Sequence, residues 1–324
     1  MSEIAFAPIQ QIDLKKIDLN DNLYQITIPK NFDALCQSIQ QMGMMHQPVL
    51  QAKNLTYRVI SGFQRILASQ KIGMEMISGR VVESDVSAYD CARWAVADNT
   101  SQRSLTPLEQ SRALALIEKT LPKTVTIHEV ACQMGLPVTS KAIHQIRTLC
   151  HMAPYIQKGI AKEYIAIPIA HALTNFSDTD AFSFAKLFEQ LNVGINIQRE
   201  LLTTCDEISK RDHKSVTDII ESETVKSIIV RYADDRKQRI HYIREHFKTI
   251  RYPTYTTIKR KVDSNIKHLK LDKPTRLTPP PYFESDIWQL QIDFKSIKDL
   301  NNSLTNILSK TDSINKIIEQ DIRL

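Results

Sequence analysis

The first hundred residues switch repeatedly between two hydrophobic periods. Stretches with alternating apolar residues or several β-branched residues predict strands at 12–14, 17–19, 48–51, 57–60 and 77–82, the first two at sheet edges. Apolar residues spaced three or four apart predict helices over 32–42, from 66 to Gly73, and over 88–98. This order predicts a mixed α/β domain over residues 1–105.

The next hundred residues predict helices only. Thr106-Pro107-Leu108-Glu109 combines a threonine cap, a proline at the first helical position and a glutamate at the third, which is a strong helix start. A second helix is predicted over 126–134, then a break at Gly135-Leu136-Pro137. Thr139 or Ser140 can cap a third helix that runs to about residue 152. We predict an all-α domain over residues 106–211.

The last third of the chain contains no glycine, which favours long helices. Helix is predicted over 217–250 and again to about 271, and period-two alternation predicts a strand over 288–294. In the final helix, residues 300, 304, 307, 311, 314 and 318 are spaced by four and three. This spacing is typical of a coiled-coil seam, which favours self-association, and equally of a helix that faces a core. The region 212–324 is therefore predicted to be helical with one short strand, and the whole chain to be α+β.

Composition places the chain among soluble globular proteins, with 42% hydrophobic and 24% charged residues. We expect no membrane segment and no signal sequence, and hence a protein that stays in the cytoplasm. The five cysteines include no C-x-x-C pair, so we expect reduced thiols rather than disulfides or a metal site.

Positive charge is concentrated in one stretch. Residues 231–276 carry 14 Lys and Arg against 5 Asp and Glu, whereas residues 1–107 carry 10 of each kind. A basic segment in an otherwise neutral chain points to an anionic polymer such as nucleic acid. A solvated helix face explains the same pattern, and the charge alone does not decide between them.

The stretch "YRVISGFQRILASQKIG" turns from strand to helix through Gly62 and places Arg65 in the first helical turn. Such a turn presents backbone N–H groups and the positive end of the helix dipole, and an arginine there adds a contact suited to phosphate. A tight turn with a surface arginine is the alternative reading of this short motif.

Five pieces of the chain, in order, resemble the ParB family of partition proteins, which has a ParB/sulfiredoxin-type N-terminal domain. They are "FDALCQSIQQMG" followed by "QPV", "YRVISGFQRILAS", "ADNTSQRSLTPLEQSRAL", "TIHEVACQMG" and "IAIPIAHAL". The family's Gly-x-x-Arg-x-x-Ala is kept as Gly62, Arg65 and Ala68. Of its Glu-Asn-x-x-Arg-x-x-Leu-x-Pro-x-Glu motif, the residues kept are Asn99, Leu105, Pro107 and Glu109.

The resemblance implies a function. ParB proteins bind a cytidine nucleotide through the two N-terminal motifs and a specific DNA site through a helix-turn-helix, and both ligands together close a dimeric clamp. Carried over, this implies CTP as cofactor with Mg²⁺ at Asp98 and Asn99, double-stranded DNA and a partition ATPase as partners, a homodimer, and a location on the nucleoid or a plasmid. The implied nucleotide-binding residues are Gly62, Phe63, Gln64, Arg65, Asp98, Asn99 and Arg103.

The chain departs from the family pattern where the chemistry would be. Phe63, Gln64 and Leu67 stand where the family usually has a glutamate and two arginines. Asp98 replaces a glutamate, and Gln102 replaces an arginine that reappears one place along as Arg103. Because the missing guanidiniums would hold a triphosphate, we expect nucleotide binding to be weakened or altered. If the chain is an enzyme, the resemblance makes it a CTPase, and no catalytic residue is assigned.

The predicted helix-turn-helix begins at Thr126, and its second helix carries the residues that would enter a major groove. Apolar anchors at Ile143 and Ile146 leave the opposite face to polar side chains. The predicted DNA-binding residues are Ser140, Lys141, His144, Gln145 and Arg147. An ordinary helical hairpin with a polar face is the alternative.

Three functions remain open on the sequence. The first is a DNA-binding partition protein, or a transcriptional regulator built from the same parts. The second is a ParB-fold enzyme that uses nucleotides outside partition, and the third is an adaptor that has lost the nucleotide. His128-Glu129-x-x-Cys132 imitates a zinc helix but lacks a second histidine, and sulfiredoxin chemistry lacks its cysteine at residues 61–68.

Overall fold

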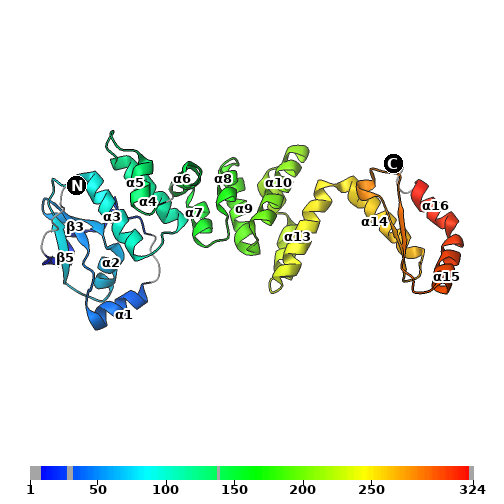
Figure 1. Ribbon diagram of the computed structural model, residues 1–324, viewed down its shortest axis with the longest axis horizontal. Coiled ribbons are helices and arrows are strands. Elements are labelled where there is room, and N and C mark those ends of the chain that lie inside the picture. Colours follow the sequence, from blue (N-terminus) through cyan, green and yellow to red (C-terminus); the bar gives the residue numbers. More distant parts are fainter. Residues whose placement is uncertain (1–8, 28–31, 137–138, 321–324) are drawn as a thin grey trace. The chain divides into compact units, whose positions relative to one another are not determined.

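The computed structural model describes residues 9–27, 32–136 and 139–320. The chain forms two compact units, Met1–Gln198 and Arg199–Leu324 (Figure 1). The α+β fold class predicted from the sequence is confirmed: a small sheet with helices precedes a long helical stretch, and one further strand pair lies near the end. Pro137, part of the predicted break, lies outside the described residues.

The first unit contains one five-stranded sheet in the order β1-β5-β3-β4-β2. Its strands are β1 (Ile9–Asp13), β2 (Ile17–Asp18), β3 (Val49–Lys53), β4 (Thr56–Ser61) and β5 (Met76–Val82). The first two are the edge strands, as their alternation predicts, although Leu14 begins a 3-10 turn instead of ending β1. Strands β3 and β4 form an antiparallel hairpin, which places the end of β4 next to the beginning of β3.

Three helices accompany this sheet in the first unit: α1 (Asp33–Met42), α2 (Phe63–Lys71) and α3 (Ala88–Gln102). Gly43 ends α1 and takes a φ of 74°, in agreement with its predicted role as a stop. Helix α3 runs about one turn beyond its predicted end at residue 98. Asn99 therefore lies on the helix together with Asp98, and not in the loop that follows it.

Further along, the described residues of this unit form α4 (Pro107–Thr120), α5 (Ile127–Gln133), α6 (Ser140–Arg147), α7 (Pro154–Ala161), α8 (Ile167–Leu173) and α9 (Asp178–Leu191). The predicted end of α6 near residue 152 is wrong. The Ser111 hydroxyl of α4 donates to the carbonyl of Arg147 and accepts from the N–H of Cys150, so tertiary hydrogen bonds replace the next helical ones. A short 3-10 turn (Leu149–His151) follows instead.

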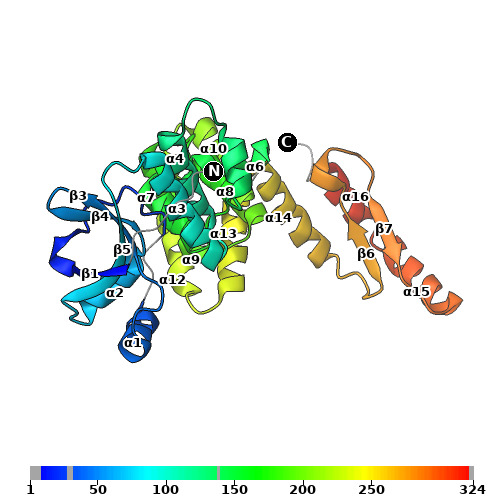
Figure 2. The ribbon, with the colours of Figure 1, turned by 60° about the vertical axis from the view of Figure 1, so that its left-hand side comes forward.

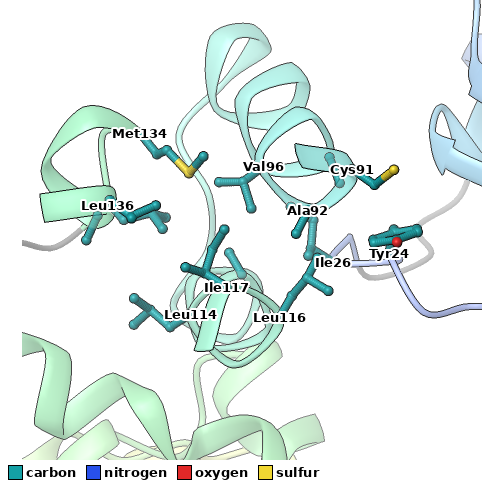
Figure 3. Packing of buried hydrophobic residues seen from close by; sticks show 14 of the residues in the cluster. Tyr24, Ile26, Cys91, Ala92, Val96, Leu114, Leu116, Ile117, Met134 and Leu136 are labelled. Carbon is teal, nitrogen blue, oxygen red and sulfur yellow. The ribbon is translucent and has the colours of Figure 1, made fainter. Parts of the chain in front are cut away.

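One hydrophobic cluster joins the sheet domain to the helices that follow it. Figure 3 shows side chains of α3 and α4 meeting, with Met134 and Leu136 at one side and Tyr24 at the other. The cluster also contains Ile60 of β4 and Val130 of α5. The predicted sheet domain and helical domain thus share a core. Because this core is closely packed, a displacement of α3 would also displace α4 and α5.

The second unit is made mostly of helices: most of α10 (Ile195–Asp212), then α11 (Val216–Ile220), α12 (Glu223–Arg231), α13 (Arg236–Arg251) and α14 (Pro253–His268). The single helix predicted over 217–250 is wrong, because Ser222 begins α12 and the Asp235 side chain caps α13. The interruption before Pro253 is confirmed.

The last part of the chain forms a strand pair and two helices. Strand β7 (Gln289–Ile292) confirms the predicted strand and pairs with β6 (Thr275–Thr278), which the sequence did not indicate. The single final helix is wrong: α15 (Ile297–Leu308) ends before α16 (Thr311–Gln320) begins, so the seam of residues 300–318 is interrupted. Figure 2 shows the β6–β7 pair beside both helices. Ile314 and Ile317 pack with Val262 of α14, whereas Leu308 is 73% exposed.

Candidate ligand cavity and nucleic-acid interface

The turn between β4 and α2 requires glycine for two independent reasons. Gly62 caps α2 with a left-handed φ of 94°, and no side chain caps this end of the helix. A Cβ atom at residue 62 would lie 2.8 Å from the Cβ of Pro48, which precedes β3. The strand-glycine-helix arrangement predicted from the sequence is present, and Gly62 fixes the position of α2 against the β3–β4 hairpin.

A cavity of about 410 Å³ opens beside this turn. Its walls come from α1, the loop after Gly43, the first turn of α2 and the end of α3. Of the residues predicted to bind nucleotide, those that line the cavity are Gly62, Phe63, Gln64, Arg65, Asn99 and Arg103. Asp98 does not line it. The structure thus brings together two motifs that are separated by more than thirty residues in the sequence.

The Arg65 guanidinium is bonded within the protein. Its Nη1 donates to the carbonyl oxygens of His46 and Gln47, at 2.7 and 3.1 Å, and its Nη2 donates to Oδ2 of Asp98 at 2.8 Å. Only 14% of the Arg65 side chain is exposed. Arg65 therefore ties the loop before β3 and helix α3 to α2, and any phosphate in the cavity would compete with these partners.

Both carboxylate oxygens of Asp98 already accept hydrogen bonds. Oδ2 accepts from Arg65 and from the Ser61 hydroxyl, and Oδ1 accepts from Nε2 of Gln102 at 3.1 Å. The nearby Asn99 donates to the carbonyl of Ala95 at 2.7 Å. Within the described ranges there is no group of three His, Cys, Asp or Glu residues that could hold a metal ion.

Arg103 is paired with a buried acid at the start of α4. Its Nη1 and Nη2 donate to the two oxygens of Glu109, at 2.7 and 2.6 Å, and the Glu109 side chain is fully buried. Glu109 also accepts from the backbone N–H and the hydroxyl of Thr106, as the sequence predicts for a capping box. This ion pair raises the pKa of Arg103. Arg103 thus connects the cavity wall to the first helix of the helical domain.

Phe63, which follows Gly62 at the start of α2, is 6% exposed. It packs with Val59 and Ile66 in a second cluster, between the sheet and α2, while one side of it lines the cavity. Other apolar walls come from Leu35, Ile39 and Met44. Sequence reasoning missed these walls, because their residues are spread over α1 and the loop that follows it and form no motif.

The predicted recognition helix α6 presents a polar surface. Ile143 and Ile146 pack against the cluster shared by α3, α4 and α5, and no residue of α6 is buried. All of the predicted DNA-binding residues are exposed: Ser140, Lys141, His144, Gln145 and Arg147. The anchors therefore lie where the sequence places them.

The arrangement of α5 and α6 follows from local signals. Thr126 and Glu129 form a capping box at the start of α5, and Gly135 takes a φ of 66° after its end. Thr139 caps α6 by accepting from the N–H of Ala142. Arg147 makes an ion pair with Glu118 of α4, with 3.0 Å between Nε and Oε2.

Part of the basic charge in the second unit is neutralised locally. Arg244 of α13 forms a two-bond ion pair with Glu200, and Arg251 pairs with Glu207. On α14, Lys259, Arg260 and Lys261 are exposed. The excess of Lys and Arg counted in residues 231–276 therefore overestimates the unpaired positive charge on this surface.

No protein-family model matches the chain. A stretch of 97 residues, 30% of this chain, is 28% identical to a probable plasmid-partitioning protein ParB of Thermus thermophilus. This stretch of the chain is similar to a ParB protein. The match covers 32% of that relative, so it spans about a third of the relative's length.

Solved ParB structures are similar to this chain as well. A truncated chromosome-partitioning protein ParB from Caulobacter crescentus, complexed with CTP-γ-S, is 14% identical with a TM-score of 0.27, over 56% of this chain and 99% of that one. The same Caulobacter protein complexed to the centromeric parS site is 16% identical with a TM-score of 0.29, over 60% and 97%. A Pnob8-like ParB-N domain is 14% identical with a TM-score of 0.38, over 74% and 100%.

No helix among the described residues combines the length and the apolar composition that a membrane span requires.

Proposed function

We propose that this chain is a ParB-like protein of plasmid or chromosome partition that binds double-stranded DNA through α6. The observation that carries the proposal is the position of α6: its apolar anchors sit on the shared core while its five predicted DNA-binding side chains are exposed. The similarity of a 97-residue stretch to a probable plasmid-partitioning protein ParB supports the same reading. A plain helical hairpin would not require a polar face with two cations on it.

The residues of α6 divide by the chemistry of their side chains. Lys141 and Arg147 supply positive charge for phosphate or guanine, and His144 and Gln145 supply groups that can hydrogen-bond base edges. Ser140, at the first turn, suits a phosphate or a base contact. Arg147 must leave Glu118 to engage DNA, which is inexpensive because the Arg147 side chain is 58% exposed.

The cavity beside Gly62 is the candidate nucleotide site, with a cytidine nucleotide as the family's ligand and Mg²⁺ as its companion ion. Arg65, Gln64 and Arg103 would contact the ligand, and Asp98 and Asn99 would hold the ion. Because Asp98 and both arginines are engaged within the protein, we propose that triphosphate binding is weak here. Hydrolysis, if it occurs, would be that of a CTPase.

We further propose that the chain acts as a homodimer that closes on DNA, associates with the nucleoid or a plasmid in the cytoplasm, and works with a partition ATPase. Its parts would be a ParB-like domain over 1–105, a DNA-binding domain over 106–211 and a dimerisation region over 212–324. The strand pair and α15 and α16 would supply the dimer contacts, since Leu304 and Leu308 expose apolar surface there.

Selection from a random pool of duplex DNA tests the proposal. The full chain is expected to enrich one duplex sequence over successive rounds, with an affinity at least about a thousandfold above that for unselected DNA. Failure to enrich any sequence, at low as well as physiological salt, would contradict it. Repeating the selection with CTP and Mg²⁺ would then show whether the nucleotide changes the enrichment.

A further inference from the structure

Among the described residues, the charges around the cavity nearly cancel. Among the described residues that line it, the only lysine or arginine side chains are Arg65 and Arg103, and none is an aspartate or glutamate. Each of these arginines is held by a carboxylate outside the lining, Asp98 or Glu109. The wall of the cavity therefore presents two ion pairs, each without net charge, rather than two unpaired cations.

A triphosphate is a poor ligand for such a wall. Each phosphate brings about one to two negative charges at neutral pH. A phosphate that drew Arg103 away would leave the fully buried carboxylate of Glu109 without its cation, and burying an unpaired charge is costly. Drawing Arg65 away would also break its bonds to the carbonyls of His46 and Gln47.

The remaining walls suit a ring that carries hydroxyl and amide groups. Leu35, Ile39, Met44 and Phe63 provide apolar surface. Uncharged hydrogen-bonding side chains come from Thr27, Ser38, Asn99 and Gln102, which also line the cavity. The volume of about 410 Å³ falls in the range of small-molecule sites.

We propose that this cavity selects a nucleoside and that each added phosphate weakens binding. The proposal rests on the assignment of the cavity as the nucleotide site above, and it deepens that assignment by naming the ligand class. The base packs against the apolar wall, the sugar and base hydroxyl and amide groups bond to the uncharged polar side chains, and both ion pairs stay intact. The protein would then sense an uncharged ligand where the family motif is built for a triphosphate.

Calorimetric titration of the full chain with cytidine, CMP and CTP tests this, with and without Mg²⁺. Cytidine is expected to bind at least about tenfold more tightly than CTP, with CMP between them. Adenosine serves as a second nucleoside, to establish whether the base is discriminated. CTP as the tightest ligand of the unmodified chain would overturn the proposal, as would the failure of both nucleosides to bind.

Two variants place the binding in this cavity. Ser38→Trp, an exposed position on the cavity wall, should abolish cytidine binding by filling the space, whereas Gln37→Trp, the exposed neighbour that does not line the cavity, should leave it unchanged. Gln64→Arg adds an arginine where the family has one and should raise CTP affinity by at least about tenfold. Equal cytidine binding in both tryptophan variants would refute the location.

The two proposals fail separately. If the DNA selection enriches a site but neither nucleoside binds, the nucleoside inference is wrong and the DNA-binding function stands. If cytidine binds in the cavity but no DNA is enriched, the partition function is wrong and the ligand class stands.

Discussion

Nη2 of Arg65 lies 2.8 Å from Oδ2 of Asp98, and this contact joins the first turn of α2 to the end of α3. The cation of the Gly-x-x-Arg motif and the acid of the second motif are therefore partners of each other. Both were predicted to face a nucleotide and its metal ion. A ligand that carries phosphates must therefore either break this ion pair to reach Arg65 or bind without a contact to Arg65.

The Asp98→Asn substitution separates the two roles of this acid. It keeps the shape of the side chain and removes its charge, so Arg65 gains freedom to meet a phosphate. We expect the affinity for CTP in the absence of Mg²⁺ to rise by about threefold to tenfold in a calorimetric titration. Asp85→Asn, at an exposed acid just before α3, is the control and should change nothing. A fall in CTP affinity would identify Asp98 as a ligand of the nucleotide complex.

The Gly62→Ala substitution should destabilise the first unit strongly. The left-handed backbone and the approach of Pro48 both oppose a Cβ, and together they cost about 2–4 kcal/mol in the free energy of unfolding. Gly73→Ala, after the other end of α2, is the matched control. The added Cβ has the same left-handed backbone penalty but no neighbouring atom within 4 Å, so the substitution should lower the free energy of unfolding by only about 1–2 kcal/mol. Urea denaturation of both variants measures this, and equal losses would contradict the close approach.

Acid should destabilise the second unit through His246. Burial lowers the pKa of this histidine below its usual 6.5, and Nε2 has no hydrogen-bond partner among the described residues. The unfolded chain therefore takes up a proton at higher pH than the folded one, so the free energy of unfolding is unaffected above the unfolded pKa and falls as the pH drops through it.

Urea denaturation at about pH 7.5 and about pH 5.5 measures this effect. The loss of stability on acidification should be smaller in His246→Gln than in the unmodified chain. His241→Gln, at an exposed histidine on the same helix, should keep the full loss. A His246→Gln variant that loses as much stability as the unmodified chain would rule out this histidine as the cause.

The cysteines should react in the order of their exposure. Cys132 is exposed, whereas burial raises the pKa of Cys205 to about 12 and that of Cys91 to about 11. Brief treatment of the native chain with iodoacetamide should therefore label Cys132 first and leave Cys91 and Cys205 unmodified until urea is added. Peptide mass spectrometry gives the extent at each site, and early labelling of Cys205 would contradict the packing of the second unit.

Local signals explain how much of the fold could be predicted. The capping box at Thr106 fixes the start of α4, and Gly62 forms the turn that leads into α2. Both features are found where the sequence places them. Period-two alternation likewise placed the edge strands. The helix break before α13 was missed, although Asp235 supplies an ordinary cap, because no glycine or proline marks it in the sequence.

The sequence predicted part of the candidate site by residue, but not the hydrogen bonds between those residues. Six of the seven residues predicted to bind nucleotide line the cavity, although its apolar walls were missed. The pairing of Arg65 with Asp98 joins residues 33 apart and leaves no local trace in the sequence. The same holds for the end of α6, which Ser111 imposes from another helix. Long-range hydrogen bonds of this kind decide whether an arginine is available to a ligand, and only the folded chain contains them.

The central claim, that α6 reads DNA, is tested most directly by competition binding. Fluorescence anisotropy would compare the selected duplex with a scrambled duplex of the same composition, for the full chain and for the Lys141→Ala/Arg147→Ala double variant. We expect the preference for the selected duplex to fall to about one in the double variant, with an unchanged circular dichroism spectrum, while Lys119→Ala, an exposed lysine of α4, keeps it. An undiminished preference in the folded double variant would contradict the account.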